Sequence, residues 1–186
     1  WSNTGNVNEV WMYNPGMDIW SECSALPLGP IFSSFGSSGS IVGDTIYFLG
    51  GASEIGPFNL SDRFRKGFIH PDDPTQIDWI IQKTDNAVGY RMGAAQVDGQ
   101  AYWIGGSQTS YNYDGIAYNG SGGVAATSRL LQYNPTTGLF LAYDGLFPEV
   151  MDLRGLAQVG PKSFVSVGGM TGNQQVTNRV VRYDIN

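Results

Sequence analysis

The chain has 186 residues, of which only 14% are charged, and its formal net charge is −6. A negative surface repels the phosphate backbone, so we expect no nucleic-acid binding. No apolar run approaches the ~20 residues that a membrane-spanning helix needs. Cys23 is the single cysteine and His70 the single histidine, which excludes an internal disulfide framework and disfavours zinc. We therefore expect no metal and no other cofactor.

The first predicted strand covers residues 8–13 and ends in Tyr13-Asn14-Pro15. A second predicted strand, residues 18–23, carries Trp20 seven positions after the tyrosine. Asn, Pro and Gly each suit tight turns for steric reasons, so the intervening Asn14-Pro15-Gly16 predicts a hairpin.

The next predicted strands cover residues 36–42 and 46–51, and the second of them ends in Gly50-Gly51. Residues 52–75 then predict a long loop, which precedes a strand predicted over 76–81.

This predicted loop concentrates charge in a chain that is otherwise poor in it. Arg63 and Arg65 lie within it, and guanidinium groups suit carboxylates and other anions. One interpretation is therefore an anion-binding or carboxylate-binding contact. The other is a solvated loop with internal ion pairs.

The same order returns in the middle of the chain. A first pair of strands is predicted over 91–97 and over the run that ends in Gly105-Gly106. A second pair is predicted over 128–133 and 138–143. A second long loop, residues 107–127, separates the two pairs.

The second long loop combines tyrosine with Asn, Ser and Gly, which is typical of adaptable recognition surfaces. Tyr111, Tyr113 and Tyr118 are candidates to stack on sugar rings or to anchor a peptide. The alternative is a loop that these tyrosines hold against its own sheet.

The last predicted strands cover residues 154–159, the run that ends in Gly168-Gly169, and residues 177–184. The third of these strands contains Tyr183-Asp184, which matches Tyr13-Asn14 and Tyr133-Asn134.

The repeated unit is thus a strand ending in Gly-Gly, a strand ending in Tyr-Asn or Tyr-Asp, and, in two copies, an aromatic residue seven positions later. From Gly51 to Gly106 is 55 residues and from Gly106 to Gly169 is 63. This pattern resembles the kelch repeat, whose length is near ~50 residues. The resemblance implies an all-β fold, a β-propeller of four-stranded antiparallel blades, of which this chain holds about three.

We expect one propeller segment over residues 1–186, with almost no helix because no sustained helical period is present. Blade cores are expected near 36–85, 90–145 and 153–186, with residues 1–25 completing a preceding blade. Kelch propellers usually close with six or seven blades. The remaining blades are therefore expected from an absent part of the polypeptide or from a second copy, and Trp1 in place of Met suggests a processed or excised chain.

In an antiparallel blade, the connection between the second and third strands lies on the same rim as the connection to the next blade. We call this rim the loop face, and long loops there are usually functional. Arg91 and Arg154 are predicted to open the first strands of two blades, where kelch domains often carry an arginine at the mouth of the central channel. The resemblance implies that both point toward a central ligand, with Gly36 near the same place in the first blade. The alternative is that they bond strand-end carbonyls.

We predict a non-enzymatic binding module that recognises a protein or a glycan. A composition rich in Asn, Gly, Ser, Thr and Tyr and poor in lysine favours an extracellular or cell-surface location over the cytoplasm.

The alternative function is a carbohydrate-active enzyme similar to the kelch-type sialic acid mutarotases, which use a glutamate and an arginine. Glu54 with Arg63 or Arg65, or Glu149 with Arg154, would be the pair. Copper radical oxidases of the galactose oxidase type also resemble this architecture. They need two histidine ligands, which the chain does not have.

Overall fold

The computed structural model describes residues 7–29, 31–53, 59–110, 124–153, 156–173 and 175–185. All regular structure in these residues is β-strand, which confirms the all-β prediction, and none of them is helical. Within the same ranges, no helix has the length and apolarity needed to cross a membrane.

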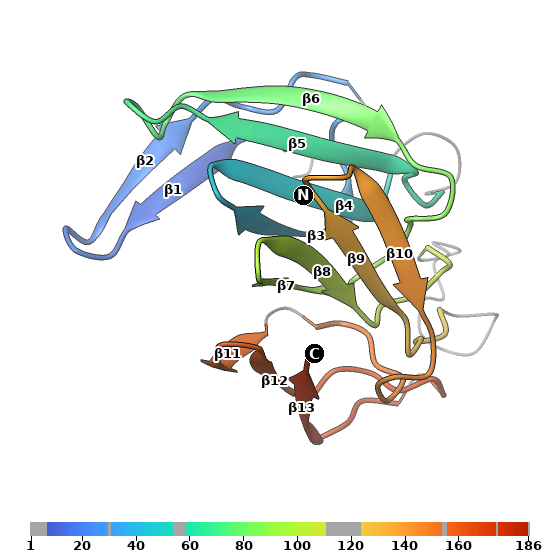
Figure 1. Ribbon diagram of the computed structural model, residues 1–186. Coiled ribbons are helices and arrows are strands. Elements are labelled where there is room, and N and C mark those ends of the chain that lie inside the picture. Colours follow the sequence, from blue (N-terminus) through green and yellow to red (C-terminus); the bar gives the residue numbers. More distant parts are fainter. Residues whose placement is uncertain are drawn as a thin grey trace.

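The strands form one two-stranded sheet and three larger antiparallel sheets. The three larger sheets follow one another from top to bottom of Figure 1. The bounds are β1 (Val10–Asn14) and β2 (Ile19–Cys23); β3 (Phe35–Val42), β4 (Thr45–Ala52), β5 (Arg63–Ile69) and β6 (Ile77–Lys83); β7 (Gly93–Val97), β8 (Gln100–Ile104), β9 (Leu130–Asn134) and β10 (Leu139–Tyr143); and β11 (Ala157–Gly160), β12 (Ser163–Val167) and β13 (Val180–Asp184).

The core lies between neighbouring sheets, because alternate side chains of each strand point to opposite faces. Aromatic and aliphatic side chains fill both interfaces. Between β3–β6 and β7–β10 the buried set includes Tyr47, Leu49, Phe64, Trp103, Leu131 and Tyr133. Between β7–β10 and β11–β13 it includes Tyr102, Ile104, Leu130, Phe164, Tyr183 and Ile185.

Two of the three Gly-Gly pairs lie where the backbones of neighbouring sheets meet. Gly50 has a φ of 72°. A Cβ added there would overlap the carbonyl oxygen of Gly89, which lies in the segment that leads into β7 of the next sheet. The N–H of Gly51 donates to that same carbonyl at 2.8 Å. Gly105-Gly106 repeats the arrangement against Val150. The motif therefore marks a backbone seam between sheets, where only glycine fits.

The first four-stranded sheet differs from the sequence-based prediction. Residues 52–75 were expected to form one loop, but β5 lies within them and pairs with both β4 and β6. The strand predicted over 76–81 belongs to β6 and is the fourth strand of its sheet, not the third. The prediction of a loop of more than twenty residues was therefore wrong here.

The loop was predicted because the third strand of this sheet lacks the tyrosine that identifies the third strands of the other two sheets. By register, Gly67 occupies the position of Tyr133 and Tyr183 in the other two sheets. Trp79 pairs with Gly67 across the sheet, and its ring occupies the space that a Cβ on Gly67 would need. The aromatic ring thus comes from the fourth strand, so β5 lacks the Tyr-Asn signature.

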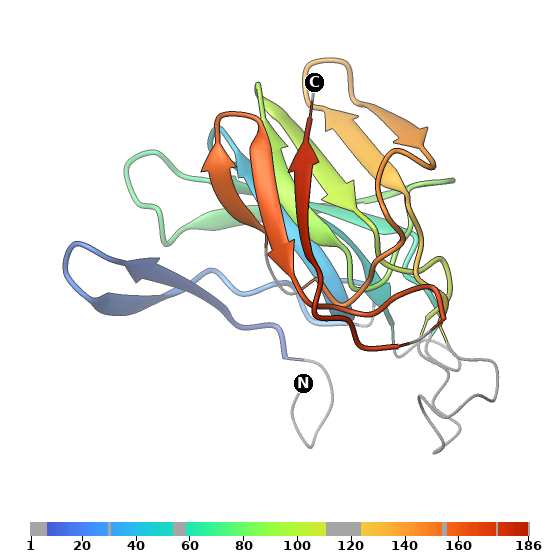
Figure 2. The ribbon, with the colours of Figure 1, turned by 90° about the horizontal axis from the view of Figure 1, so that it is seen from below.

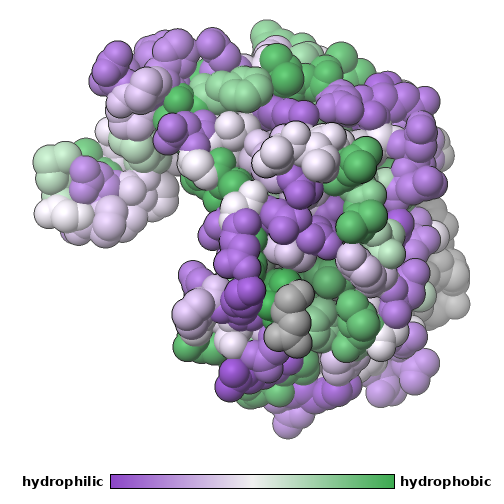
Figure 3. Space-filling view, viewed as in Figure 1, coloured by the Kyte–Doolittle hydropathy of each residue, from purple (hydrophilic) through white to green (hydrophobic). Residues whose placement is uncertain are grey.

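The two-stranded sheet β1–β2, residues Val10–Cys23, projects from the rest of the molecule, and we call it the aromatic arm (Figure 2). In the space-filling view it forms a separate lobe that exposes both hydrophobic and hydrophilic residues (Figure 3). Its base is fixed at Ser24, whose N–H donates to Thr75 O at 2.8 Å and whose carbonyl accepts the Trp79 indole N–H at 3.0 Å.

Candidate functional site

Three equivalent backbone positions open the three larger sheets. Gly36, Arg91 and Asp152 each adopt a left-handed conformation, with φ of 69°, 55° and 58°. They are equivalent because the residue before each one pairs with the residue that follows a Gly-Gly motif. Non-glycine residues adopt positive φ rarely, and such positions often occur at functional sites.

These positions surround a cavity of about 600 Å³ at the start of the first strands. Apolar and polar side chains both contribute to its wall. The lining includes Phe35, Gly36, Ser38, Arg91, Met92 and Asp152. The cavity is therefore lined by the first strands of two large sheets and by the segment that precedes β11 in the third.

An ion pair crosses this cavity. Arg91 Nη1 lies 2.5 Å from Asp152 Oδ1, and the two side chains are 24% and 17% exposed. The Arg91 guanidinium also lies 5.0 Å from the centroid of the Tyr90 ring, and its backbone N–H donates to Gly36 O at 2.7 Å. The pair thus presents nitrogen donors and carboxylate acceptors side by side at a partly solvated surface.

Gly36 allows Tyr90 to pack closely against the backbone at this site. A Cβ added at Gly36 would overlap the Tyr90 ring and approach the Arg91 side chain. Any larger residue there would displace the Tyr90 ring and disturb Arg91.

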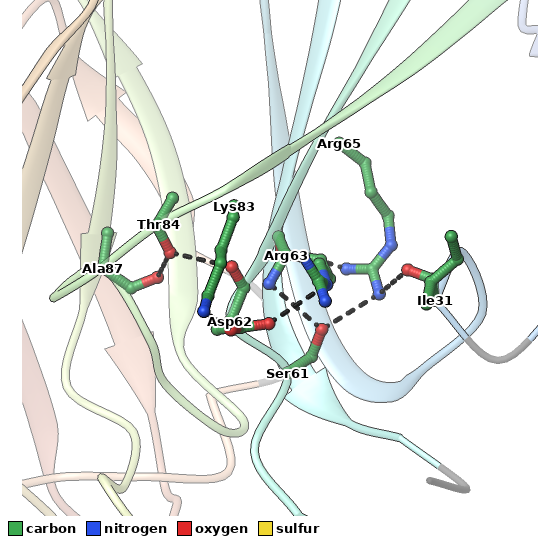
Figure 4. Close-up of polar contacts among 8 residues, drawn as sticks. All are labelled: Ile31, Ser61, Asp62, Arg63, Arg65, Lys83, Thr84 and Ala87. Atoms are coloured by element: carbon green, nitrogen blue, oxygen red, sulfur yellow. Dashed lines mark hydrogen bonds and ion pairs between the residues drawn. The ribbon is translucent and has the colours of Figure 1, made fainter.

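A second cluster of charges lies at the start of β5 (Figure 4). The carboxylate of Asp62 pairs with Arg63 at 3.1 Å and with Lys83 at 3.6 Å, and these three side chains are partly exposed. Isolated pairs of this kind contribute little to stability.

Arg65 differs from these groups because it is fully buried. Its guanidinium donates to the carbonyls of Ile31 and Arg63 and to the Ser61 hydroxyl, each at 3.2 Å. No carboxylate among the described residues pairs with it. Burial, with a smaller contribution from the charge of Arg63, lowers the pKa of Arg65 to about 10.

Arg65→Ala is expected to lower the free energy of unfolding by about 2 kcal/mol, because three acceptors lose their donor and a void replaces the side chain. Arg63→Ala, the matched control, is expected to cost less than about 1 kcal/mol because its ion pair is partly exposed. Urea denaturation followed by tryptophan fluorescence measures both. Equal costs would contradict a supporting role for Arg65.

The chain resembles known proteins in its three-dimensional structure but not detectably in its sequence. No protein-family model matches the sequence, and no curated protein matches it significantly. The solved structure of YjhT matches with a TM-score of 0.68 at 13% sequence identity, over 96% of this chain and 50% of YjhT. The likeness supports a kelch-like propeller fold. The chain spans half the length of YjhT.

The structure places the predicted site residues in three groups. Arg91 lines the cavity. Arg63 and Arg65 lie in strand β5, whereas the sequence analysis put them in a loop. The remaining predicted residues, Tyr111, Tyr113, Tyr118, Arg154 and also Glu54, lie outside the described residues.

Asp152 was missed by the sequence analysis, which aligned Arg154 with Arg91. The register makes Asp152 the equivalent of Arg91, because Met151 pairs with Met170 just as Tyr90 pairs with Ser107. No spacing in the sequence identifies Asp152, because it lies 17 residues before Gly169, whereas Gly36 and Arg91 lie 15 residues before Gly51 and Gly106.

The described residues contain no group of three His, Cys, Asp or Glu side chains arranged to hold a metal ion. Glu149, the other candidate acid or base, is exposed.

Proposed function

We propose that the chain is part of a kelch-type propeller that recognises a protein or a glycan through the cavity of Gly36, Arg91 and Asp152. The observation that carries the proposal is the partly exposed Arg91–Asp152 pair in a cavity of about 600 Å³. Recognition sites combine apolar walls with a few placed polar groups, and this cavity has both.

The ligand offers hydrogen-bond donors and acceptors close together. Asp152 accepts from hydroxyl or amide groups, and Arg91 donates to hydroxyl, carbonyl or carboxylate oxygens. Phe35 and Met92 supply apolar surface beside the pair. Neighbouring sugar hydroxyls or a polar peptide turn have this chemistry.

The loop face supplies further contacts in this proposal. Tyr111, Tyr113, Tyr118 and Arg154 extend the site, and Arg63 contributes a partly exposed guanidinium. Arg65 is buried, so it acts on a ligand only through its bonds to Arg63 and Ser61.

We also propose that the three larger sheets are about half of a closed ring. The chain covers half of YjhT, which supports this proportion. The remaining blades come from a longer polypeptide or from a second copy.

The test is a glycan and peptide array, followed by titration of the best ligand against Arg91→Asn. Asn tolerates the left-handed conformation, so the variant removes the guanidinium with little backbone strain. We expect affinity to fall at least tenfold, about 1.4 kcal/mol, with the melting transition unchanged. The control is Arg179→Ala, which removes an exposed arginine outside the cavity.

Retained affinity in Arg91→Asn would contradict the proposal. Loss of the cooperative melting transition in this variant would show that Arg91 stabilises the fold instead of binding the ligand, and would contradict it as well. The enzymatic alternative predicts turnover of a bound sugar that disappears in Glu54→Ala or Glu149→Ala. Assaying each array ligand for turnover separates the two functions.

We propose that the module acts outside the cell or at its surface, on the composition described above. Fractionation of the native source protein checks this. Recovery in the cytoplasm alone would overturn it.

A further inference from the structure

A second cavity, of about 240 Å³, lies at the start of β5. Its wall comes mainly from the segment that leads into this strand, and the lining includes Ile31, Asn59, Ser61, Asp62 and Arg63. We call it the β5 cavity. A water molecule occupies about 30 Å³ in the liquid, so this cavity has room for a small polyatomic ion and part of its hydration shell.

A buried positive charge lies behind the wall of the β5 cavity. Arg65 is fully buried, and its Nη2 donates to the Ile31 carbonyl and to the Ser61 hydroxyl, both of which belong to lining residues. Its Nε is also buried, and none of the described residues accepts a hydrogen bond from it. Because the pKa of Arg65 is about 10, the guanidinium stays charged at neutral pH.

The fold does not require a charge at this position. By register, Arg65 occupies the place of Leu131 in β9 and of Val181 in β13, so the other two large sheets have an apolar residue there. Burying a guanidinium in place of an apolar side chain costs desolvation free energy. A buried charge that the packing does not need is a candidate functional group.

The Ser61 hydroxyl links this charge to the β5 cavity (Figure 4). Its oxygen accepts hydrogen bonds from Arg65 Nη2 at 3.2 Å and from the backbone N–H of Arg63 at 3.3 Å. A hydroxyl oxygen has two lone pairs, so its own proton is left to donate. In the part of the chain that the structure describes, no acceptor takes that proton. The bond from the guanidinium polarises the hydroxyl and makes it a stronger donor to a ligand.

The charges around the β5 cavity favour an anion. Arg63 lines it, and Asp62 holds both Arg63, at 3.1 Å, and Lys83, at 3.6 Å. With Arg65, these described groups are three cations and one carboxylate, which leaves two positive charges in surplus. The whole chain has a formal net charge of −6, so this surplus is a local concentration of positive charge.

We propose that the β5 cavity binds a small oxyanion, the chemistry shared by phosphate, sulfate and carboxylate groups. The anion accepts hydrogen bonds from the Ser61 hydroxyl and the Arg63 guanidinium, while Arg65 balances its charge from behind the wall. The described lining residues of this cavity and of the Arg91–Asp152 cavity do not overlap, so the proposal is independent of the function proposed above.

The test is calorimetric titration of the wild type with sodium phosphate, sodium sulfate and sodium acetate in turn, at constant ionic strength. We expect saturable binding of at least one of them, and the comparison of acetate with the other two distinguishes a carboxylate from a phosphate or sulfate ligand. Arg63→Gln and Arg65→Met should each weaken binding at least tenfold. Arg179→Gln, the matched control, removes an exposed arginine outside both cavities and should bind like the wild type.

Arg65→Met keeps a side chain of similar length where the other two large sheets are apolar, so the variant should fold, which circular dichroism checks. If it does not fold, Arg63→Gln decides alone, because the Arg63 ion pair is partly exposed.

The absence of saturable binding for all three anions would overturn the proposal. Binding that Arg63→Gln retains would do so too, as would an equal loss in Arg179→Gln, which would indicate unspecific attraction. Arg91→Asn should leave oxyanion binding unchanged, and a loss there would assign the anion to the other cavity. Failure of the Arg91–Asp152 site would be seen separately, on the glycan and peptide array.

Discussion

Gly105→Ala is expected to lower the free energy of unfolding by about 3–5 kcal/mol. A side chain at a φ of 67° costs about 1–2 kcal/mol. The added methyl group also overlaps the carbonyl of Val150, which Gly106 binds at 2.8 Å, so the two sheets must separate locally. Overpacking and weakening of a buried hydrogen bond add about 2–3 kcal/mol. Urea denaturation followed by tryptophan fluorescence measures the change.

Substitutions at two other glycines distinguish the energetic cost of the steric overlap between sheets from the cost of placing alanine at a positive φ. Gly138 has a φ of 72°, and no atom of the described residues lies within 4 Å of an added Cβ, so Gly138→Ala should cost only about 1–2 kcal/mol. Gly168 is the equivalent of Gly105, but among the described residues the one atom close to an added Cβ is Thr177 O at 3.4 Å. Gly168→Ala should therefore resemble Gly138→Ala. If Gly105→Ala cost no more than these two, the backbone seam would not explain the Gly-Gly motif.

Phe64→Ala is expected to cost about 3–5 kcal/mol, the usual range for truncating a buried phenylalanine. Phe64 is fully buried at the interface of the first two large sheets. Its ring makes edge contacts with Tyr133 and Phe140 and lies 6.0 Å from the Trp103 ring. Loss of Phe64 therefore removes contacts between the first large sheet and three aromatic residues of the second, and a lowered denaturation midpoint should report it.

Phe68→Ala is the matched control, because Phe68 lies in the same strand and is exposed. We expect a cost below about 1 kcal/mol for this variant. Similar costs for the two substitutions would show that the packing between sheets is not what stabilises the chain.

Much of the fold was predictable because its markers are local. Gly-Gly identified the second strand of each large sheet, because every one of these glycines has a positive φ and, at Gly50 and Gly105, a neighbouring carbonyl also excludes a Cβ. Tyr-Asn identified β9 because its tyrosine is buried between sheets and the residues after it turn the chain. Strand β5 was not predicted because Gly67 stands where the other third strands have tyrosine. Trp79, at the register position of Phe140, covers this glycine with its ring.

The candidate site was only partly predictable. Arg91 was predicted as a site residue because kelch domains often carry an arginine at that point, and Arg154 was predicted at the equivalent point of the third sheet. Asp152 is two positions before Arg154, and only strand pairing reveals that it shares the left-handed conformation of Arg91. Likewise, the burial of Arg65 depends on the segment around Ile31, which is distant in the sequence.

The most direct test of the proposed function is a crystal structure of the chain with the tightest ligand from the array. The proposal predicts ligand density in the cavity between Gly36, Arg91 and Asp152, with hydrogen bonds to the guanidinium and to the carboxylate. Density that lies elsewhere, with the Arg91–Asp152 pair unchanged and uncontacted, would contradict it.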